Sequence, residues 1–193
     1  MESLIEAGYV AGVLDVTTTE LADEVVGGVL SAGPRRLEAA ARTGTPAVVV
    51  PGCLDMVNFW EPETVPKQFS ARRVYEHNPN VTLMRTTPEE NEILGKLVAE
   101  KLNRSTGPVT VYVPLRGVSV ISAPGQPFHW PEADAAFLKV LRRHLQPRIS
   151  VIEVDANIND PKFSNSISDA LLSMIESAEV PSDGPTEDQN VEL

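Results

Sequence analysis

The sequence predicts an α/β fold with a mostly parallel sheet of about five strands. Short β-branched runs alternate with longer amphipathic stretches, which is typical of strands joined by crossover helices. Each predicted strand is also a near-continuous apolar run, as expected where helices cover both faces of a sheet. These strands are residues 10–15, 46–50, 81–85, 109–113 and 149–155.

Start signals place the helices between these strands. Thr87 is a predicted N-cap, Pro88 occupies the first helical position, and Glu90 completes a capping box. Three further predicted helices begin near prolines, at Pro34, Pro131 and Pro161. The helix after Pro34 is expected to span residues 35–43, and residues 2–7 have the pattern of a short helix end.

Composition places the chain among ordinary globular proteins. It has 193 residues, of which 42% are hydrophobic and 22% charged, so it is too apolar for global disorder and too interrupted for a membrane span. A single cysteine excludes an internal disulfide scaffold. Because no basic and then apolar leader opens the chain, we expect a cytoplasmic setting and no membrane partner.

The net charge of -11 is unevenly distributed along the chain. Residues 179–193 hold five acidic residues and no basic one, which leaves -6 on residues 1–178. We therefore expect one folded domain over residues 1–178 and an acidic, disordered tail over 179–193. The negative charge also disfavours direct binding of nucleic acid, since it repels phosphate backbones.

Polar residues follow the predicted strands, at the sheet edge where open α/β folds bind ligands. Neither the phosphate-binding loop G-x-x-x-x-G-K-[ST] nor a G-x-G-x-x-G motif is present, so a bound nucleotide would use a different set of residues. The candidates for ligand binding are Thr17, Thr18, Thr19, Glu20, Gly52, Asn58, Asn78, Arg85, Thr86, Arg116, Gly117 and Ser119.

Arg85 and Arg116 are predicted at the same edge of the sheet. Two guanidinium groups near a core require carboxylate partners or a bound anion. Both interpretations remain open, and pairing is slightly favoured, with partners Asp15, Glu20 or Asp55.

The hydroxyls of residues 17–19 allow a similar choice. They bind phosphate or carboxylate oxygens, or they form an ordinary turn and N-cap. Arg35 and Arg36, at the helix start after Pro34, give only a weak signal for an anion.

His77 is the best candidate for a general acid or base, because it precedes the strand 81–85 in a predicted loop. Cys53 is a candidate nucleophile if His77 lies near it, although a lone cysteine between glycine and leucine is more often buried. The spacing of the three histidines does not indicate a structural metal. The long segment 51–80 lacks a regular pattern, which favours an ordered lid or a subunit contact.

Five runs in fixed order resemble the carboxy-terminal half of one protein family. They are GVLDVTTTELADE (12–24), SAGPRRLEAA (31–40), LDMVNF (54–59), HNPNVTLMRTT (77–87) and PGQPF (124–128). This is a family of uncharacterised microbial and plant proteins similar to the ATP-binding region of a tobamovirus resistance protein. The resemblance covers roughly residues 1–178.

The resemblance implies a three-layer, Rossmann-like domain that is the second of two α/β subdomains, so that an amino-terminal subdomain would precede Met1. It also implies a nucleotide site for ATP with Mg²⁺ near the cleft between the subdomains, and a homodimer. In this interpretation Arg85 and Arg116 hold the anion, and Asp15, Glu20 or Asp55 hold the Mg²⁺ ion.

Two functions are therefore expected. The first is a nucleotide-binding half-domain, with His77 and Asp55 as catalytic residues if hydrolase or transferase chemistry occurs. The alternative is a non-catalytic module for dimerisation or protein interaction, in which the polar loops are structural. The sequence leaves open whether the protein is an enzyme.

Overall fold

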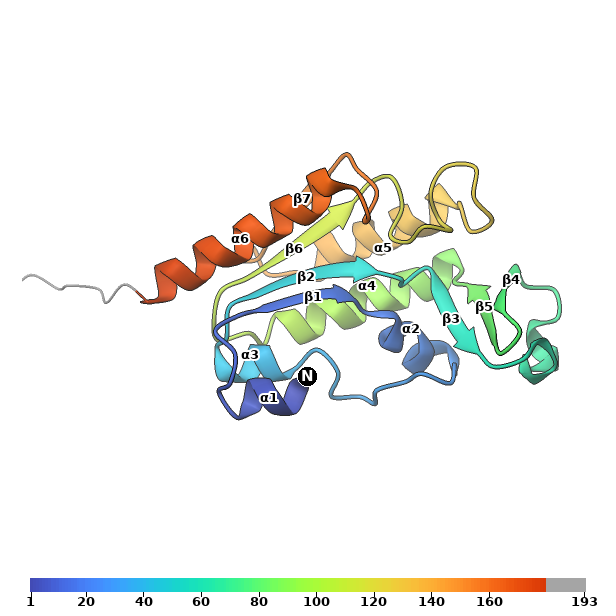
Figure 1. The fold of residues 1–193 in the computed structure, drawn as a ribbon, viewed down its shortest axis with the longest axis horizontal. Helices are drawn as coiled ribbons and strands as arrows, with labels where there is room; N and C mark the ends of the chain where they lie inside the picture. The colour runs from blue at the N-terminus through green and yellow to red at the C-terminus, as the bar shows by residue number, and fades with distance from the viewer. Residues whose placement is uncertain (180–193) are drawn as a thin grey trace, which may run out of the picture.

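Four parallel strands form the central sheet of the computed structural model, which describes residues 1–179. The strands are β1 (Val13–Thr17), β2 (Ala47–Gly52), β6 (Val109–Pro114) and β7 (Ser150–Val154), in the order β1-β2-β6-β7. Figure 1 shows β1, β2 and β6 running side by side with helices on both sides. The predicted α/β fold is thus confirmed, with four strands rather than five in the parallel sheet.

Helices cover both faces of this sheet and complete the three layers. On one face α6 (Pro161–Glu179) packs through Phe163 and Ile167 against Val48 and Val50 of β2. On the other face lie α2 (Thr19–Val26), α4 (Pro88–Leu102) and α5 (Pro131–His144), and their apolar side chains pack with Val49. Alternate residues of β2 therefore face opposite layers, as the period of a strand requires.

The third predicted strand belongs to a second sheet. Residues 81–85 form β5 (Val81–Arg85), which pairs antiparallel with β3 (Met56–Phe59) and β4 (Val74–Asn78) in the order β3-β5-β4. Figure 1 shows this sheet beyond the carboxyl ends of β1 and β2. The segment 51–80 is accordingly regular, with two strands and the short 3-10 helices Pro62–Thr64 and Lys67–Phe69.

The proline signals place three helix starts correctly and one incorrectly. Thr87 and Glu90 form the predicted capping box, and α5 and α6 begin at their prolines. Pro34 opens a turn instead, because Leu37 has a left-handed backbone with φ 72°. The short helix α3 (Ala39–Thr43) begins after this turn. The Glu2 carboxylate accepts hydrogen bonds from the backbone N–H groups of Leu37 (2.7 Å) and Ala39 (2.8 Å) at the start of this helix.

The predicted short helix at the start of the chain is present as α1 (Glu2–Glu6). The acidic tail predicted for residues 179–193 lies outside the described residues, except for Glu179 at the end of α6. Among the helices of residues 1–179, none combines the length and the apolarity needed to cross a membrane.

Candidate functional site

A cavity of about 400 Å³ opens where the ends of β1 and β2 face the antiparallel sheet. We call it the strand-end cavity. It brings together three of the predicted ligand-binding residues, Thr17, Asn58 and Ser119. The predicted catalytic residue His77 also lines it, and the four come from distant parts of the chain. Cys53 and Asn159 are further polar residues of its lining, and most of the remaining lining is aliphatic, including Val120. Ligands of open α/β folds bind at this position.

Asn58 is held by a buried network behind the cavity wall. Its amide donates to Thr19 Oγ1 (2.9 Å) and to Asp23 Oδ2 (2.8 Å), while its backbone N–H donates to Asp23 Oδ1 (2.7 Å). Burial raises the pKa of Asp23 above its ordinary value. Gly28 makes room for this carboxylate, because a Cβ at that position would lie 1.7 Å from Asp23 Oδ1. The Thr19 and Asn58 side chains thus join α2 to β3.

Asp55 lies behind Ser119 rather than on the surface of the cavity. Its carboxylate is only 1% exposed and accepts the Ser119 hydroxyl at 2.7 Å. The other carboxylate oxygen, Oδ1, has no hydrogen-bond partner among the described residues. Burial raises the pKa of Asp55 to about 6. The catalytic role predicted for Asp55 stays a prediction. In this geometry Asp55 would act on a ligand through the Ser119 hydroxyl and not by direct contact.

His77 and Cys53 both line the strand-end cavity, His77 from strand β4 rather than from the predicted loop. Cys53 has φ 57° where β2 turns away from the sheet. Within residues 1–179 no hydrogen bond joins the two side chains. Burial, with a smaller contribution from the Asp55 charge, raises the pKa of Cys53 to about 11. The sulfur is therefore a thiol at neutral pH, which makes it a weak nucleophile.

Arg85 does not reach the strand-end cavity. Its fully buried guanidinium pairs with Asp134 (2.5 Å) and donates to the backbone carbonyls of Phe128 (2.8 Å) and Trp130 (3.3 Å). This side chain therefore connects the antiparallel sheet to the start of α5.

Arg116 pairs with Asp155 through two hydrogen bonds of 2.6 and 2.8 Å, and both side chains are 61% exposed. Pairing, the interpretation favoured from the sequence, is thus correct for both arginines. The predicted partners are wrong. They were Asp15, Glu20 and Asp55, but the true partners follow later strands.

Asp15 and Glu20 are occupied by a different arginine. Arg36 forms hydrogen bonds of 2.5 and 2.6 Å to the two Asp15 oxygens, and its Nε lies 3.5 Å from Glu20 Oε2. Because the Arg36 guanidinium is already paired with these carboxylates, it does not form the anion site that the sequence weakly indicated.

Four other predicted residues make contacts that support the fold, and their role in ligand binding stays a prediction. Gly52 is required because a Cβ there would lie 2.0 Å from the Val16 carbonyl oxygen. The Thr18 hydroxyl donates to the Val50 carbonyl (3.3 Å), and the Thr86 hydroxyl donates to the Leu54 carbonyl (3.0 Å). The Asn78 side chain accepts the N–H of Asn80 in the turn between β4 and β5 (2.9 Å).

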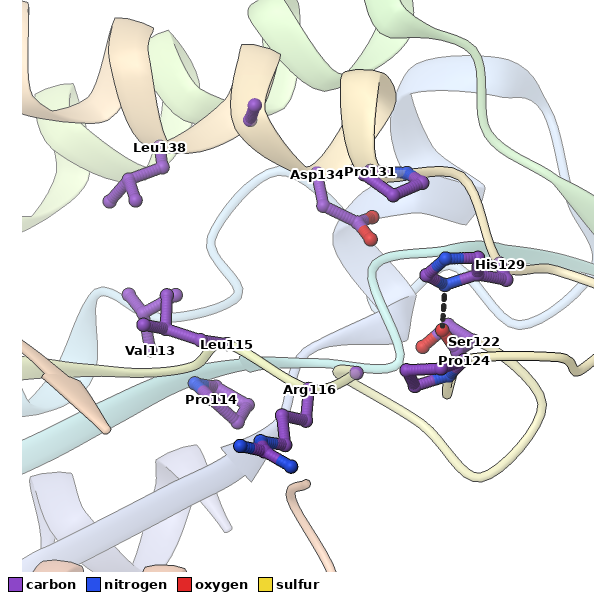
Figure 2. Close-up of a pocket in the computed structure, with 12 residues that line it drawn as sticks. Val113, Pro114, Leu115, Arg116, Ser122, Pro124, His129, Pro131, Asp134 and Leu138 are labelled. Atoms are coloured by element: carbon purple, nitrogen blue, oxygen red, sulfur yellow. Dashed lines mark hydrogen bonds between the residues drawn. The ribbon is translucent and has the colours of Figure 1, made fainter. Parts of the chain in front are cut away.

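A second cavity of about 200 Å³ lies between the end of β6 and α5, and we call it the β6–α5 cavity. Figure 2 shows Asp134 projecting from α5 into this space, with His129 beside it and Arg116 at the opposite side. His129 Nδ1 lies 3.3 Å from the Ser122 carbonyl oxygen. One loop separates the two cavities, since Ser119 and Val120 line the first while Gly117 and Ser122 line the second.

Residues 1–175 match the family described as "Uncharacterised protein family (UPF0261) C-terminal domain". The chain belongs to the UPF0261 family. It is 51% identical over 177 residues to a UPF0261 protein of Clostridium tetani, and 49% identical over 166 residues to one of Rhizobium meliloti. These matches cover 91% and 85% of this chain but 44% and 42% of the relatives. The chain therefore spans less than half the length of these UPF0261 proteins.

The same part of the UPF0261 domain matches a plant protein. It is 42% identical over 174 residues to the ToMV resistance protein Tm-1 of Solanum lycopersicum, which covers 89% of this chain and 23% of the tomato protein. The predicted family resemblance is thus confirmed, together with the expectation that relatives carry further sequence.

Sequence reasoning missed several residues that shape the candidate site and its surroundings. Asp134 and Asp155 lie 49 and 39 positions from their arginines, so no local pattern connects them. The Asn157 amide orders the loop between the cavities by donating to the Ser119 carbonyl (3.1 Å). Among residues 1–179, no three histidine, cysteine, aspartate or glutamate side chains gather in a way that would hold a metal ion.

Proposed function

We propose that this UPF0261 domain is a nucleotide-binding half-domain, with the base and ribose of ATP in the strand-end cavity. The observation that carries the proposal is the convergence of Thr17, Asn58, His77 and Ser119 on one cavity at the carboxyl ends of the strands. A volume of about 400 Å³ lies within the usual range for small-molecule sites. Its aliphatic walls suit a nucleobase, and its hydroxyl, amide and imidazole groups suit hydrogen bonds to base and sugar.

The triphosphate needs cations that this cavity does not supply. Its lining contains no lysine or arginine, and Arg85 and Arg116 are each paired with a carboxylate elsewhere. We therefore assign the phosphates and Mg²⁺ to the rest of the protein, in agreement with the greater length of the relatives. His77, at an exposed position of β4, would move a proton if the bound nucleotide undergoes hydrolysis or group transfer.

A substitution at the rim of the cavity tests this proposal. Val120 is 64% exposed and lines the cavity, so Val120→Trp narrows the entrance without disturbing the core. We expect the complete protein with this change to bind ATP at least about tenfold more weakly in titration calorimetry with Mg²⁺, a loss of about 1.4 kcal/mol. The control is Ile93→Trp, a similar exchange on α4 at a 53% exposed position outside the cavity. Equal ATP affinity in both variants, or no binding by the unmodified protein, would contradict the proposal.

The pairing of both arginines favours a second candidate, a non-catalytic module that forms a homodimer. The surface that we consider is the segment before β4, where Trp60 is 48% exposed. Phe59, by contrast, is 2% exposed and packs against Phe69, so it belongs to the core.

The oligomeric state of the complete protein tests the second candidate. We expect sedimentation velocity to show a dimer that Trp60→Ser weakens, because the exchange removes a large apolar contact from the surface. A monomer at the highest accessible concentration, or a dimer indifferent to the exchange, would count against this candidate.

A further inference from the structure

The β6–α5 cavity has apolar walls and one carboxylate. Val113, Leu115 and Leu138 supply aliphatic surface, and Asp134 projects from α5 into the space (Figure 2). One Asp134 oxygen, Oδ1, accepts the buried Arg85, which fixes the position of the carboxylate. At about 200 Å³ the cavity is smaller than a typical drug-sized site, so it suits a small molecule.

Carboxylates outnumber buried guanidinium groups around this cavity. Against the larger effect of burial, the charge of the buried Arg85 lowers the pKa of both Asp134 and Asp55, although only Asp134 contacts it. The His129 ring also lowers the pKa of Asp134. Asp55 Oδ1 is buried without a partner among the described residues. Glu132, on the same helix, adds further negative potential at Asp134. Arg116 on the opposite wall does not compensate, because Asp155 pairs with it.

His129 adds a second hydrogen-bond acceptor beside Asp134. A carbonyl oxygen can only accept, so the contact between Nδ1 and the Ser122 carbonyl places a proton on Nδ1. In the neutral ring Nε2 then carries the lone pair. Figure 2 shows this nitrogen on the side of the ring that faces Asp134. The polar groups at this end of the cavity therefore favour a ligand that donates hydrogen bonds and carries positive charge.

We propose that the β6–α5 cavity is a second binding site, for a small primary ammonium with an apolar body. The ammonium group donates to the Asp134 carboxylate and to His129 Nε2, and its alkyl or aryl part packs on Leu138 and the proline-rich loop. The added positive charge balances the excess of carboxylates around Arg85. An anion is disfavoured by the same carboxylates, and a metal ion by the presence of only two suitable ligands at this end of the cavity.

Three probe molecules of nearly equal size, n-butylammonium, 1-butanol and butyrate, distinguish binding that depends on charge from binding that depends on shape alone. We expect titration calorimetry of the complete protein at low ionic strength to show saturable binding of n-butylammonium. 1-Butanol should bind at least about tenfold more weakly, because it lacks the charge that meets Asp134. Butyrate should show no binding. Equal affinity for the alcohol and the ammonium, or no binding of the ammonium, overturns the proposal.

Two substitutions place the binding in this cavity. Asp134→Asn should weaken ammonium binding at least tenfold, but it also deprives buried Arg85 of its partner and endangers folding. Ala135→Phe avoids that problem, because Ala135 is an exposed helix position that lines the cavity, and the ring should abolish binding by filling it. The matched control is Ala178→Phe, the same exchange at an exposed position of α6, which should bind as the unmodified protein does. Unchanged binding in a folded Ala135→Phe variant overturns the proposal.

This inference stands apart from the nucleotide proposal. Val120→Trp alters the strand-end cavity and should leave ammonium binding unchanged, while Ala135→Phe should leave ATP binding unchanged. Measuring both ligands on both variants therefore shows which of the two proposals is wrong if only one of them fails.

Discussion

Replacing Arg85 with alanine is expected to lower the free energy of unfolding by about 3–5 kcal/mol, the usual result when one partner of a buried ion pair is removed. The Arg85 side chain is fully buried. Its loss leaves the Asp134 carboxylate and the Phe128 carbonyl without the guanidinium donor, while the Trp130 carbonyl keeps the backbone N–H groups at the start of α5. Urea unfolding followed by circular dichroism measures the change. Arg85→Lys should recover little of it, since an ammonium cannot reproduce the geometry of the guanidinium.

The matched control for this substitution is Arg116→Ala. Arg116 lies just after strand β6 and also pairs with one aspartate, here through two hydrogen bonds, but this pair is exposed to solvent. We expect its urea midpoint to stay close to that of the unmodified protein, as is usual for exposed ion pairs. Equal losses in the two variants would show that burial is not what gives the Arg85 pair its importance.

Replacing Asp55 with asparagine is expected to stabilise the protein at pH 7, by up to about 3 kcal/mol. Burial raises the pKa of Asp55 to about 6, so the folded protein holds a proton that the unfolded chain has already lost between about pH 4 and pH 6. The contribution of Asp55 to stability therefore falls as the pH rises through this range. Asparagine removes this dependence, and its amide oxygen can still accept the Ser119 hydroxyl.

The measurement is the difference in free energy of unfolding between the two proteins at pH 4 and at pH 7. That difference should grow with pH, because only the unmodified protein carries the buried charge. Asp155→Asn is the control, because the contribution of Asp155 to stability should change with pH in the opposite direction. The Arg116 hydrogen bonds lower the pKa of Asp155, so its contribution is present at neutral pH and is lost as the pH falls. A constant difference for Asp55→Asn would show that Asp55 has an ordinary pKa.

The helices that begin with capping signals were predictable because the signals are local. Thr87, Pro88 and Glu90 lie within four residues, and the capping box forms as the pattern indicates. Leu37 shows where local signals fail. The left-handed turn there is stabilised by Glu2, a residue 35 positions earlier, so Pro34 alone misleads. In the same way, the apolar run of β5 reveals burial but not the direction of its pairing, which depends on distant partners.

The site was predictable at the level of position. The rule that ligands bind at the carboxyl ends of strands selected Thr17, Asn58 and Ser119, which the fold gathers around one cavity together with His77. The rule could not distinguish side chains that face the cavity from those that support it. Thr86, for example, follows a strand and is fully buried. That distinction depends on tertiary packing, which no single loop contains.

The loop between β6 and α5 forms one wall of both cavities, with Val120 on one side and Ser122 on the other. Any ligand that changes the conformation of this wall therefore changes the free energy of binding on its far side. Thermodynamic linkage makes such an effect reciprocal: a factor by which an occupant of the β6–α5 cavity alters affinity in the strand-end cavity must appear equally in the other direction. Without such a conformational change, the two cavities bind their ligands independently.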